Sequence, residues 1–216
     1  MPKKKSLKIT EIFASIQGET SKIGLPTVFI RLTGCPLRCQ YCDTSYAFYD
    51  GKLMIFQDII GQVKKYNCKD VCVTGGEPLA QSNSKELLKD LVDLNFQVSL
   101  ETGGSMSLEG IDERVKIIMD IKTPDSKEVT KNRWENLGIL KKSDELKFVI
   151  CSREDYQWSK IIIEQYKMID ICPILFSPCS ESLDPRDLAE WILSDQLPIR
   201  FQMQIHKILW DNQPGR

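Results

Sequence analysis

The sequence has a single histidine, almost no net charge and no long hydrophobic run. Histidine can supply only one ligand to any metal site, His206. Lysine and arginine number 29 against 30 acidic residues, so no overall field attracts nucleic acid or an anionic membrane surface. No apolar run reaches the roughly 18 residues of a membrane-spanning helix, and the N-terminus lacks the apolar core of a secretory signal. We therefore expect a cytoplasmic protein that binds neither nucleic acid nor membrane.

The chain also lacks a linker rich in proline, glycine or serine, an internal repeat and a low-complexity tract. Its apolar fraction of 42% is sufficient for a sizeable hydrophobic core. We predict one domain over residues 1–216.

Short apolar segments alternate along the chain with segments that have helical periodicity. Leu87, Leu88, Leu91 and Leu94, for example, recur at helical spacing. Helices are predicted at 82–96, 153–168 and 184–196, and strands at 8–13, 27–34, 70–76, 97–104, 116–122, 145–150, 172–178 and 199–206. This alternation predicts an α/β fold with parallel strands, either an open doubly wound sheet or a full or partial (β/α) barrel.

Unusual polar residues follow five of these predicted strands. The five segments are GCPLRCQYC, GGEP, ETGG, KTPDS and SPCSES. In folds of parallel strands, the loops at the carboxyl ends of the strands carry the chemistry. The five strand ends therefore predict a functional site along one rim of the fold.

Three of the eight cysteines, Cys35, Cys39 and Cys42, fall within eight residues. In a reducing compartment, clustered thiols more often bind metal than form disulfides. Structural zinc usually takes four protein ligands, so a zinc site would need Cys68, Cys72 or His206 as well. An iron–sulfur cluster accepts three thiolates at close spacing and leaves one iron free for a chelating ligand. The other five cysteines, Cys68, Cys72, Cys151, Cys172 and Cys179, are scattered, and we expect them to pack as small apolar residues.

The cysteine segment resembles the signature of the radical S-adenosylmethionine enzymes, because Tyr41 directly precedes Cys42 in a C-x3-C-x2-C pattern. TGGEP, residues 74–78, is similar to the second motif of these enzymes, in which glycine backbone closely approaches the cofactor. The resemblance implies a modified or partial (β/α) barrel. It also implies a four-iron, four-sulfur cluster on Cys35, Cys39 and Cys42, with S-adenosylmethionine chelating the fourth iron.

A narrower resemblance covers nearly the whole chain. SIQGET, Arg31, CDTSY, TGGEP, ETGG, DIKTPDS and QIHK together resemble the 7-carboxy-7-deazaguanine synthases. This implies radical conversion of 6-carboxy-5,6,7,8-tetrahydropterin to 7-carboxy-7-deazaguanine, with loss of ammonia, on the route to queuosine. It further implies a one-electron donor such as flavodoxin, a Mg2+ ion and a homodimer.

The resemblance also implies the role of each site residue. Glu19 can accept paired hydrogen bonds from a 2-aminopyrimidinone edge, and the planar fork of Arg31 suits a substrate carboxylate. The implied substrate residues are Ile16, Gln17, Gly18, Glu19, Arg31, Thr74 and His206, although His206 could equally be a hydrogen-bonded structural residue. Thr44 is the implied Mg2+ ligand. The implied cofactor residues are Tyr41, Cys42, Asp43, Gly76, Glu101, Lys122, Thr123, Pro124, Ser177, Pro178, Cys179 and Ser180.

Two other functions are compatible with parts of this pattern. A radical-generating activase of a glycyl-radical enzyme or of anaerobic ribonucleotide reductase would keep the cysteine loop and GGEP, but has no reason to keep SIQGET with Arg31. A non-catalytic zinc- or cluster-binding module would leave the five polar strand ends unexplained.

Overall fold

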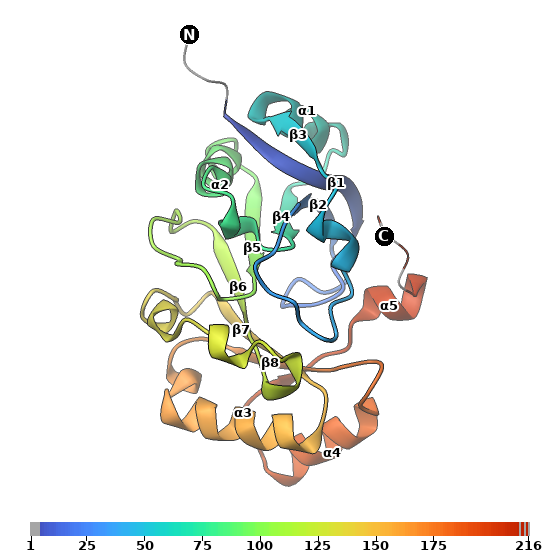
Figure 1. The fold of residues 1–216 in the computed structure, drawn as a ribbon, viewed down its shortest axis with the longest axis vertical. Helices are drawn as coiled ribbons and strands as arrows, with labels where there is room; N and C mark the ends of the chain where they lie inside the picture. The colour runs from blue at the N-terminus through green and yellow to red at the C-terminus, as the bar shows by residue number, and fades with distance from the viewer. Residues whose placement is uncertain (1–4, 212, 214, 216) are drawn as a thin grey trace.

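A computed structural model describes residues 5–211, 213 and 215 of the chain (Figure 1). The strands are β1 (Ser6–Ile16), β2 (Pro26–Leu32), β3 (Lys52–Ile55), β4 (Asp70–Gly75), β5 (Gln97–Thr102), β6 (Lys116–Ile121), β7 (Glu145–Ile150), β8 (Ile174–Pro178) and β9 (Arg200–Phe201). The helices are α1 (Phe56–Lys65), α2 (Ser84–Asp93), α3 (Arg153–Gln165), α4 (Pro185–Ser194) and α5 (Ile205–Trp210).

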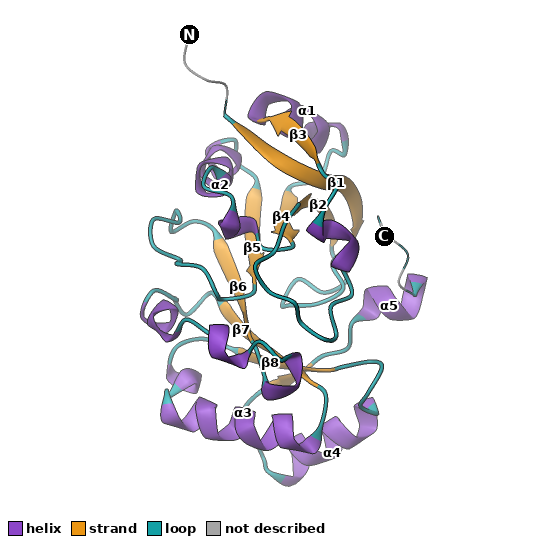
Figure 2. Cartoon of the chain, viewed as in Figure 1, coloured by secondary structure: helices purple, strands orange, loops and turns teal. Residues whose placement is uncertain are grey.

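Within this described part, the nine strands form one sheet in the order β3-β1-β2-β4-β5-β6-β7-β8-β9. β1 is antiparallel to β2 and β3, and every neighbouring pair from β2 to β9 is parallel. The sheet curves into an open arc, and α1 to α4 lie on its outer side (Figure 2). The predicted partial (β/α) barrel is confirmed. Helices α1 to α4 do not cover its inner face, which can therefore hold a functional site.

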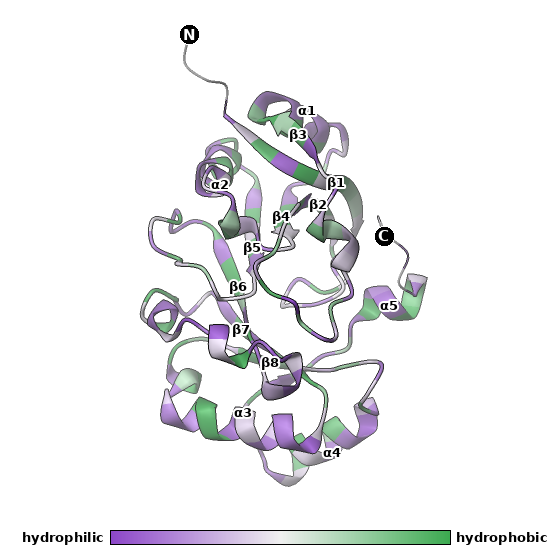
Figure 3. Ribbon diagram, in the orientation of Figure 1, coloured by the Kyte–Doolittle hydropathy of each residue, from purple (hydrophilic) through white to green (hydrophobic). Residues whose placement is uncertain are grey.

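Alternation along the strands divides the core from this inner face. The outward residues of β7, Leu146, Phe148 and Ile150, belong to the hydrophobic core beneath the helices. Leu87, Leu88 and Leu91 of α2 are fully buried in the same core, which explains their helical spacing in the sequence. Leu94, the fourth leucine of that pattern, follows the last residue of α2 and is exposed. Hydrophobic and hydrophilic bands also alternate along β1 (Figure 3). Since side chains of a strand alternate between faces, the intervening residues point into the arc.

The prediction of a strand over 199–206 is wrong for most of its length. β9 comprises only Arg200 and Phe201, and residues from Ile205 onward form α5. The chain leaves the sheet because the backbone N–H of Ile205 donates to the carbonyl of Gly18, at 3.1 Å, instead of to a neighbouring strand. The segment thereby crosses to the open side of the arc, where α5 lies (Figure 1). No described helix is long and apolar enough to cross a membrane.

Candidate active site

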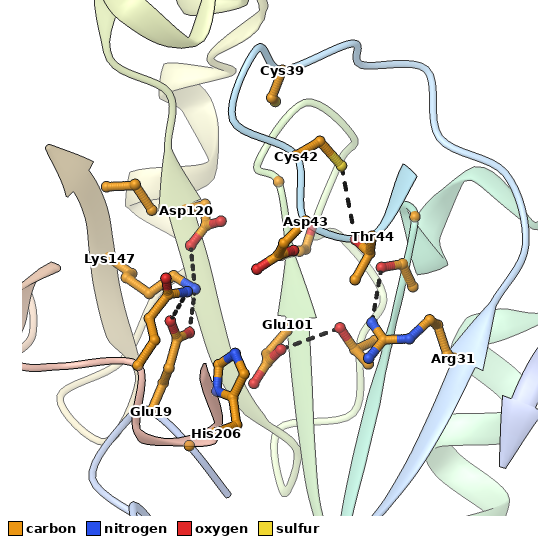
Figure 4. Close-up of a pocket in the computed structure, with 18 of the residues that line it drawn as sticks. Glu19, Arg31, Cys39, Cys42, Asp43, Thr44, Glu101, Asp120, Lys147 and His206 are labelled. Carbon is orange, nitrogen blue, oxygen red and sulfur yellow. Dashed lines mark hydrogen bonds and ion pairs between the residues drawn. The ribbon is translucent and has the colours of Figure 1, made fainter. Parts of the chain in front are cut away.

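A cavity of about 210 Å³, partly open to solvent, lies inside the arc at the carboxyl ends of the parallel strands (Figure 4). It brings together residues that are distant in the sequence. The predicted site residues that line it are Ile16, Gln17, Gly18, Glu19, Arg31, Cys35, Cys39, Tyr41, Cys42, Asp43, Thr44, Thr74, Gly76, Glu101, Lys122, Cys179 and His206.

The cysteine loop, residues 33–44, is held against the loop that follows β4. The carbonyl of Gly34 accepts a hydrogen bond from the backbone N–H of Glu77 at 2.8 Å, and Gly34 itself has a positive φ of 94°. A Cβ atom on Gly76 would lie only 2.0 Å from that carbonyl oxygen. The second glycine of GGEP is therefore needed for the approach of the two loops.

The same loop is also tied to the segment that follows β6. The backbone N–H of Arg38 donates to Glu128 Oε1 at 2.5 Å, and that of Gln40 donates to the carbonyl of Ser126 at 3.1 Å. The Arg38 guanidinium donates to the carbonyl of Cys35 at 2.7 Å and stacks 4.2 Å from the ring centroid of Phe48. These contacts hold the backbone that carries the three thiols.

The donor set at this loop fits an iron–sulfur cluster. Cys35, Cys39 and Cys42 are partly exposed, and burial raises the pKa of Cys35 to about 11, so metal binding would have to displace its proton. Cys68 instead donates to the carbonyl of Pro26 at 3.1 Å, and Cys72 is buried within β4. In residues 5–211, 213 and 215, no three His, Cys, Asp or Glu side chains lie close enough to share one metal ion. Three thiolates without a fourth cysteine match a cluster with one open iron better than structural zinc.

Charged side chains from several strands form a network on the inner wall of the cavity. Lys147 Nζ lies 2.5 Å from Glu19 Oε2 and 3.3 Å from Asp120 Oδ1 (Figure 4). Lys122 Nζ lies 2.9 Å from Asp120 Oδ2. Burial opposes the charge of Lys147, but Asp120 and Glu19 hold its pKa well above the usual value. Burial likewise opposes the charge of Asp120, yet Lys122 and Lys147 lower its pKa. Lys147 and Asp120 are therefore both charged at neutral pH.

Further hydrogen bonds fix the carboxylates of this wall. Gln204 Nε2 donates to Glu19 Oε1 at 2.6 Å, so residues from both ends of the chain meet here. Glu101 accepts from Gln17 Nε2 at 3.2 Å and from the Thr74 hydroxyl at 3.1 Å. Glu101 was predicted to bind the cofactor, but both of its partners are predicted substrate residues.

Arg31 is held rigidly at the side of the cavity. Its Nε donates to Glu11 Oε1 at 2.7 Å and its Nη1 to the carbonyl of Gly75 at 3.4 Å. The rings of Phe13 and Tyr46 each have their centroid 5.9 Å from the guanidinium carbon. Such packing presets the orientation of the guanidinium before any ligand binds.

The segment around α5 completes the cavity. The ring of His206 lies directly against Gly18, where a Cβ atom would come within 2.0 Å of Nδ1. Burial lowers the pKa of His206, so its imidazole is neutral at pH 7. Lys207 Nζ lies 3.1 Å from Asp43 Oδ2, which links the segment to the cysteine loop. Thr44 Oγ1 lies 3.8 Å from Cys42 Sγ on the same loop.

Five predicted cofactor residues lie away from this lining: Thr123, Pro124, Ser177, Pro178 and Ser180. The Thr123 hydroxyl donates to Asp155 Oδ2 at 2.9 Å, behind the ends of β6 and β7, and Pro124 begins a short 3-10 turn. Ser177 and Pro178 are buried in β8, whereas Ser180 is exposed.

Sequence reasoning missed Asp120, Lys147, Gln204 and Glu77. Lys147 stands in a strand whose six residues are all buried, and Asp120 interrupts an equally apolar strand. A charged residue between apolar residues within a strand was the signal that could have found both. Glu77 links the loop after β4 to the end of β5. Its buried carboxylate accepts hydrogen bonds from the Thr102 hydroxyl at 2.9 Å and from the Gly103 N–H at 2.8 Å.

The partial barrel and the three-thiol loop at its rim define a radical S-adenosylmethionine enzyme. Residues 29–133 match the family model described as the Radical SAM superfamily. The 7-carboxy-7-deazaguanine synthase of Chlorobaculum tepidum is 43% identical over 95% of this chain and 94% of its own length. The 7-carboxy-7-deazaguanine synthase of Thermoplasma acidophilum is 38% identical over 96% of this chain and 99% of its own length. The chain belongs to the 7-carboxy-7-deazaguanine synthase family.

Solved structures share the fold. QueE from Escherichia coli aligns with a TM-score of 0.76 over 92% of this chain and 93% of that chain, at 20% identity. Streptococcus suis SuiB bound to S-adenosylmethionine aligns with a TM-score of 0.54 over 79% of this chain and 45% of that chain, at 16% identity. At these identities the two structures support the architecture alone.

Proposed function

We propose that this chain converts 6-carboxy-5,6,7,8-tetrahydropterin to 7-carboxy-7-deazaguanine with loss of ammonia, in queuosine biosynthesis. The observation that carries the proposal is that the three thiols, Glu19 and Arg31 line the same cavity. A four-iron cluster with S-adenosylmethionine would supply, when bound, the radical abstraction of a hydrogen atom from the substrate. The chain's own residues must then place the pterin carbon that reacts.

Glu19 and Arg31 are suited to the two polar ends of a carboxypterin. A carboxylate offers about four lone-pair sites, and Lys147 and Gln204 each use one on Glu19. The remaining sites can accept the paired N–H groups of the aminopyrimidinone. Arg31 lies on another side of the cavity, with part of its fork free of Glu11 and Gly75, and it can bind the substrate carboxylate (Figure 4).

The cofactor side of the cavity has matching features. The Tyr41 hydroxyl is buried there and has no hydrogen-bond partner in the described part of the chain, which fits a place completed by a ligand. We assign Tyr41, Asp43, Gly76, Lys122 and Cys179 to S-adenosylmethionine. Thr44, beside Cys42, is assigned to Mg2+, a cation that keeps most of its waters and needs few protein ligands.

The proposal also includes a protein that donates single electrons, such as flavodoxin, because cleavage of the cofactor consumes one electron. The partial exposure of all three cluster cysteines supports electron entry at this loop. A single domain over residues 1–216 is supported by the continuous sheet from β1 to β9. The homodimer and the cytoplasmic location stay predictions from the sequence.

The test is an anaerobic assay of the cluster-loaded protein with S-adenosylmethionine, a one-electron reductant and the carboxytetrahydropterin. Mass spectrometry should detect 7-carboxy-7-deazaguanine, together with equimolar ammonia. Glu19→Gln should lose the product but retain the cluster and the binding of S-adenosylmethionine, whereas Glu113→Gln at an exposed position should behave as the parent. Absence of the product, with a radical appearing on an added glycyl-radical enzyme, would instead support the activase.

A further inference from the structure

Two cysteines outside the cluster loop are neighbours at the carboxyl ends of adjacent strands. Cys151 directly follows β7, and Cys179 directly follows β8. The strands pair in parallel, with Ile150 opposite Pro178, and the N–H of Cys179 donates to the carbonyl of Ile150 at 2.8 Å. Adjacent strands lie about 4.8 Å apart, and a disulfide spans Cα atoms about 4.4 to 6.8 Å apart. The backbone therefore allows a bond between the two sulfurs.

The two side chains already interact. The Cys151 thiol lowers the pKa of Cys179, and the Cys179 sulfur in turn raises the pKa of Cys151. The Ser182 side chain acts to lower the pKa of both thiols. A thiolate is the form that attacks disulfides, so Cys179 has the character of a nucleophile and Cys151 that of a resolving thiol.

The surroundings of this pair differ from those of a packing cysteine. Cys72 is fully buried inside β4, as expected for a small apolar residue. Cys179 is only 7% exposed but lines the cavity, and Cys151 is partly exposed. A small molecule that enters the cavity can therefore contact Cys179.

We propose that Cys151 and Cys179 form a thiol–disulfide exchange site that takes a low-molecular-weight disulfide of the glutathione type. The Cys179 thiolate attacks the small disulfide, forms a mixed disulfide and releases one small thiolate. The Cys151 sulfur then attacks Cys179, closes the Cys151–Cys179 bond and releases the second small thiolate. The two protein thiols are oxidised by two electrons, the small disulfide is reduced to two thiols, and the two protein protons balance the released thiolates.

Closure of this bond would change the wall of the cavity. It draws the Cys179 sulfur towards Cys151 and fixes the turn in which the N–H of Leu183 donates to the carbonyl of Cys179 at 3.0 Å. Cys179 itself is assigned to S-adenosylmethionine, so the oxidised protein binds this cofactor more weakly. This consequence rests on the proposed function, whereas formation of the disulfide does not.

The first experiment detects the bond itself. Anaerobic, cluster-loaded protein is equilibrated with mixtures of reduced and oxidised glutathione, blocked with an alkylating agent and digested with trypsin. Retained iron shows that the cluster cysteines are not exposed to the reagent. The expected product joins the peptide 148–153 to the peptide 168–186, and fragmentation or a Cys172→Ala background distinguishes Cys179 from Cys172. Free Cys151 and Cys179 under conditions that glutathionylate Cys68 would overturn the proposal.

The second experiment measures S-adenosylmethionine binding by equilibrium dialysis, without pterin. Oxidation should weaken binding by about tenfold, the size of one lost hydrogen bond, and a dithiol reductant should restore it. Cys151→Ser should keep the reduced protein's affinity and lose the response, whereas Cys68→Ser should keep the response. Unchanged affinity in the oxidised parent, with the disulfide in place, would overturn the regulatory consequence. A protein that shows the switch but makes no deazaguanine would contradict the proposed function alone.

Discussion

The rim of the cavity and its wall are built in different ways. The rim, formed by the cysteine loop at 33–44 and the loop at 75–78, is held mostly by backbone hydrogen bonds and the close approach of Gly76 to Gly34. The wall, formed by the inward side chains of Glu19, Arg31, Thr74, Glu101, Asp120 and Lys147, is held by ion pairs and side-chain hydrogen bonds. A short motif can thus specify the rim, whereas the wall exists only when distant strands pair.

This difference predicts different consequences of mutation. Rim residues hold a group that the protein must acquire, so their loss should remove the cofactor and leave the fold intact. The charged side chains of the wall stabilise one another through ion pairs. Removing one of them leaves the charge of its partner unpaired in a partly buried position. Their loss should therefore reduce the stability of the fold as well as the binding of substrate.

The largest effect is expected at the rim. Cys39→Ala should abolish cluster binding and turnover, because the cluster would keep only two protein thiolates. Iron content and the brown absorbance of the reconstituted protein measure this, and Cys68→Ala, whose thiol bonds to the Pro26 carbonyl, is the matched control. Full iron content in Cys39→Ala would contradict the assignment of the loop.

Gly76→Ala should strongly reduce the iron content without changing any ligand. The added Cβ would lie 2.0 Å from the Gly34 carbonyl oxygen and 3.2 Å from the Cys35 Cβ, so the cysteine loop must move. Gly61→Ala on α1 is the control, since nothing lies within 4 Å of the new atom. That control should stabilise the protein by up to about 1 kcal/mol. A normal iron content in Gly76→Ala would contradict this prediction, because it would show that the cysteine loop can move to accommodate the added Cβ and still bind the cluster.

At the wall, Asp120→Asn should destabilise the fold by about 3 kcal/mol at pH 7, because Lys122 and Lys147 lose a shared carboxylate. The pKa of Asp120 is lowered in the folded state, so its stabilisation is present above pH of about 4 and is lost as the pH falls through the lowered pKa. The difference between parent and variant should shrink below pH 4.

Urea unfolding of parent and variant across this pH range measures the difference. Asp90→Asn, at an exposed position on α2, is the control. It should show neither the loss of stability at pH 7 nor the dependence of that loss on pH. A constant difference between parent and Asp120→Asn down to pH 2 would mean that the ion pairs are not its cause.

The smallest effect is expected at Thr44, which belongs to the rim but is assigned to Mg2+. Thr44→Ala should raise the Mg2+ concentration that a chelator-treated enzyme needs by a few-fold, because water can replace a single hydroxyl ligand. The cluster spectrum should stay unchanged. A flat Mg2+ titration of the parent would remove this assignment.

The sequence predicted the rim better than the wall for a physical reason. Cys35, Cys39 and Cys42 lie close together in the sequence, and a tight loop is sufficient to bring GGEP into contact with them. The pairing of Asp120 with Lys147, in contrast, follows from the register of β6 against β7, which no local pattern encodes. Glu19 and Arg31 were found through family resemblance, and their partners Lys147 and Glu11 were not.

The C-terminal segment shows a second limit of sequence patterns. Alternation over 199–206 predicted a strand, but contacts of Ile205 and Gln204 with residues 18 and 19 draw the chain away from the sheet. Helices such as α2 were predictable because a buried leucine stripe requires no distant information.

The central claim is that rim and wall act on one substrate carbon, and transfer of deuterium tests it most directly. The cluster-loaded enzyme is given carboxytetrahydropterin that carries deuterium at C6, and the 5′ carbon of the adenosyl group is analysed by mass spectrometry during turnover. A misplacement of about 1 Å can cost on the order of a hundredfold in rate, so transfer requires Glu19 and Arg31 to hold C6 beside the cofactor. The account predicts deuterium in the adenosyl fragment. Deazaguanine formed without any label in that fragment would contradict it.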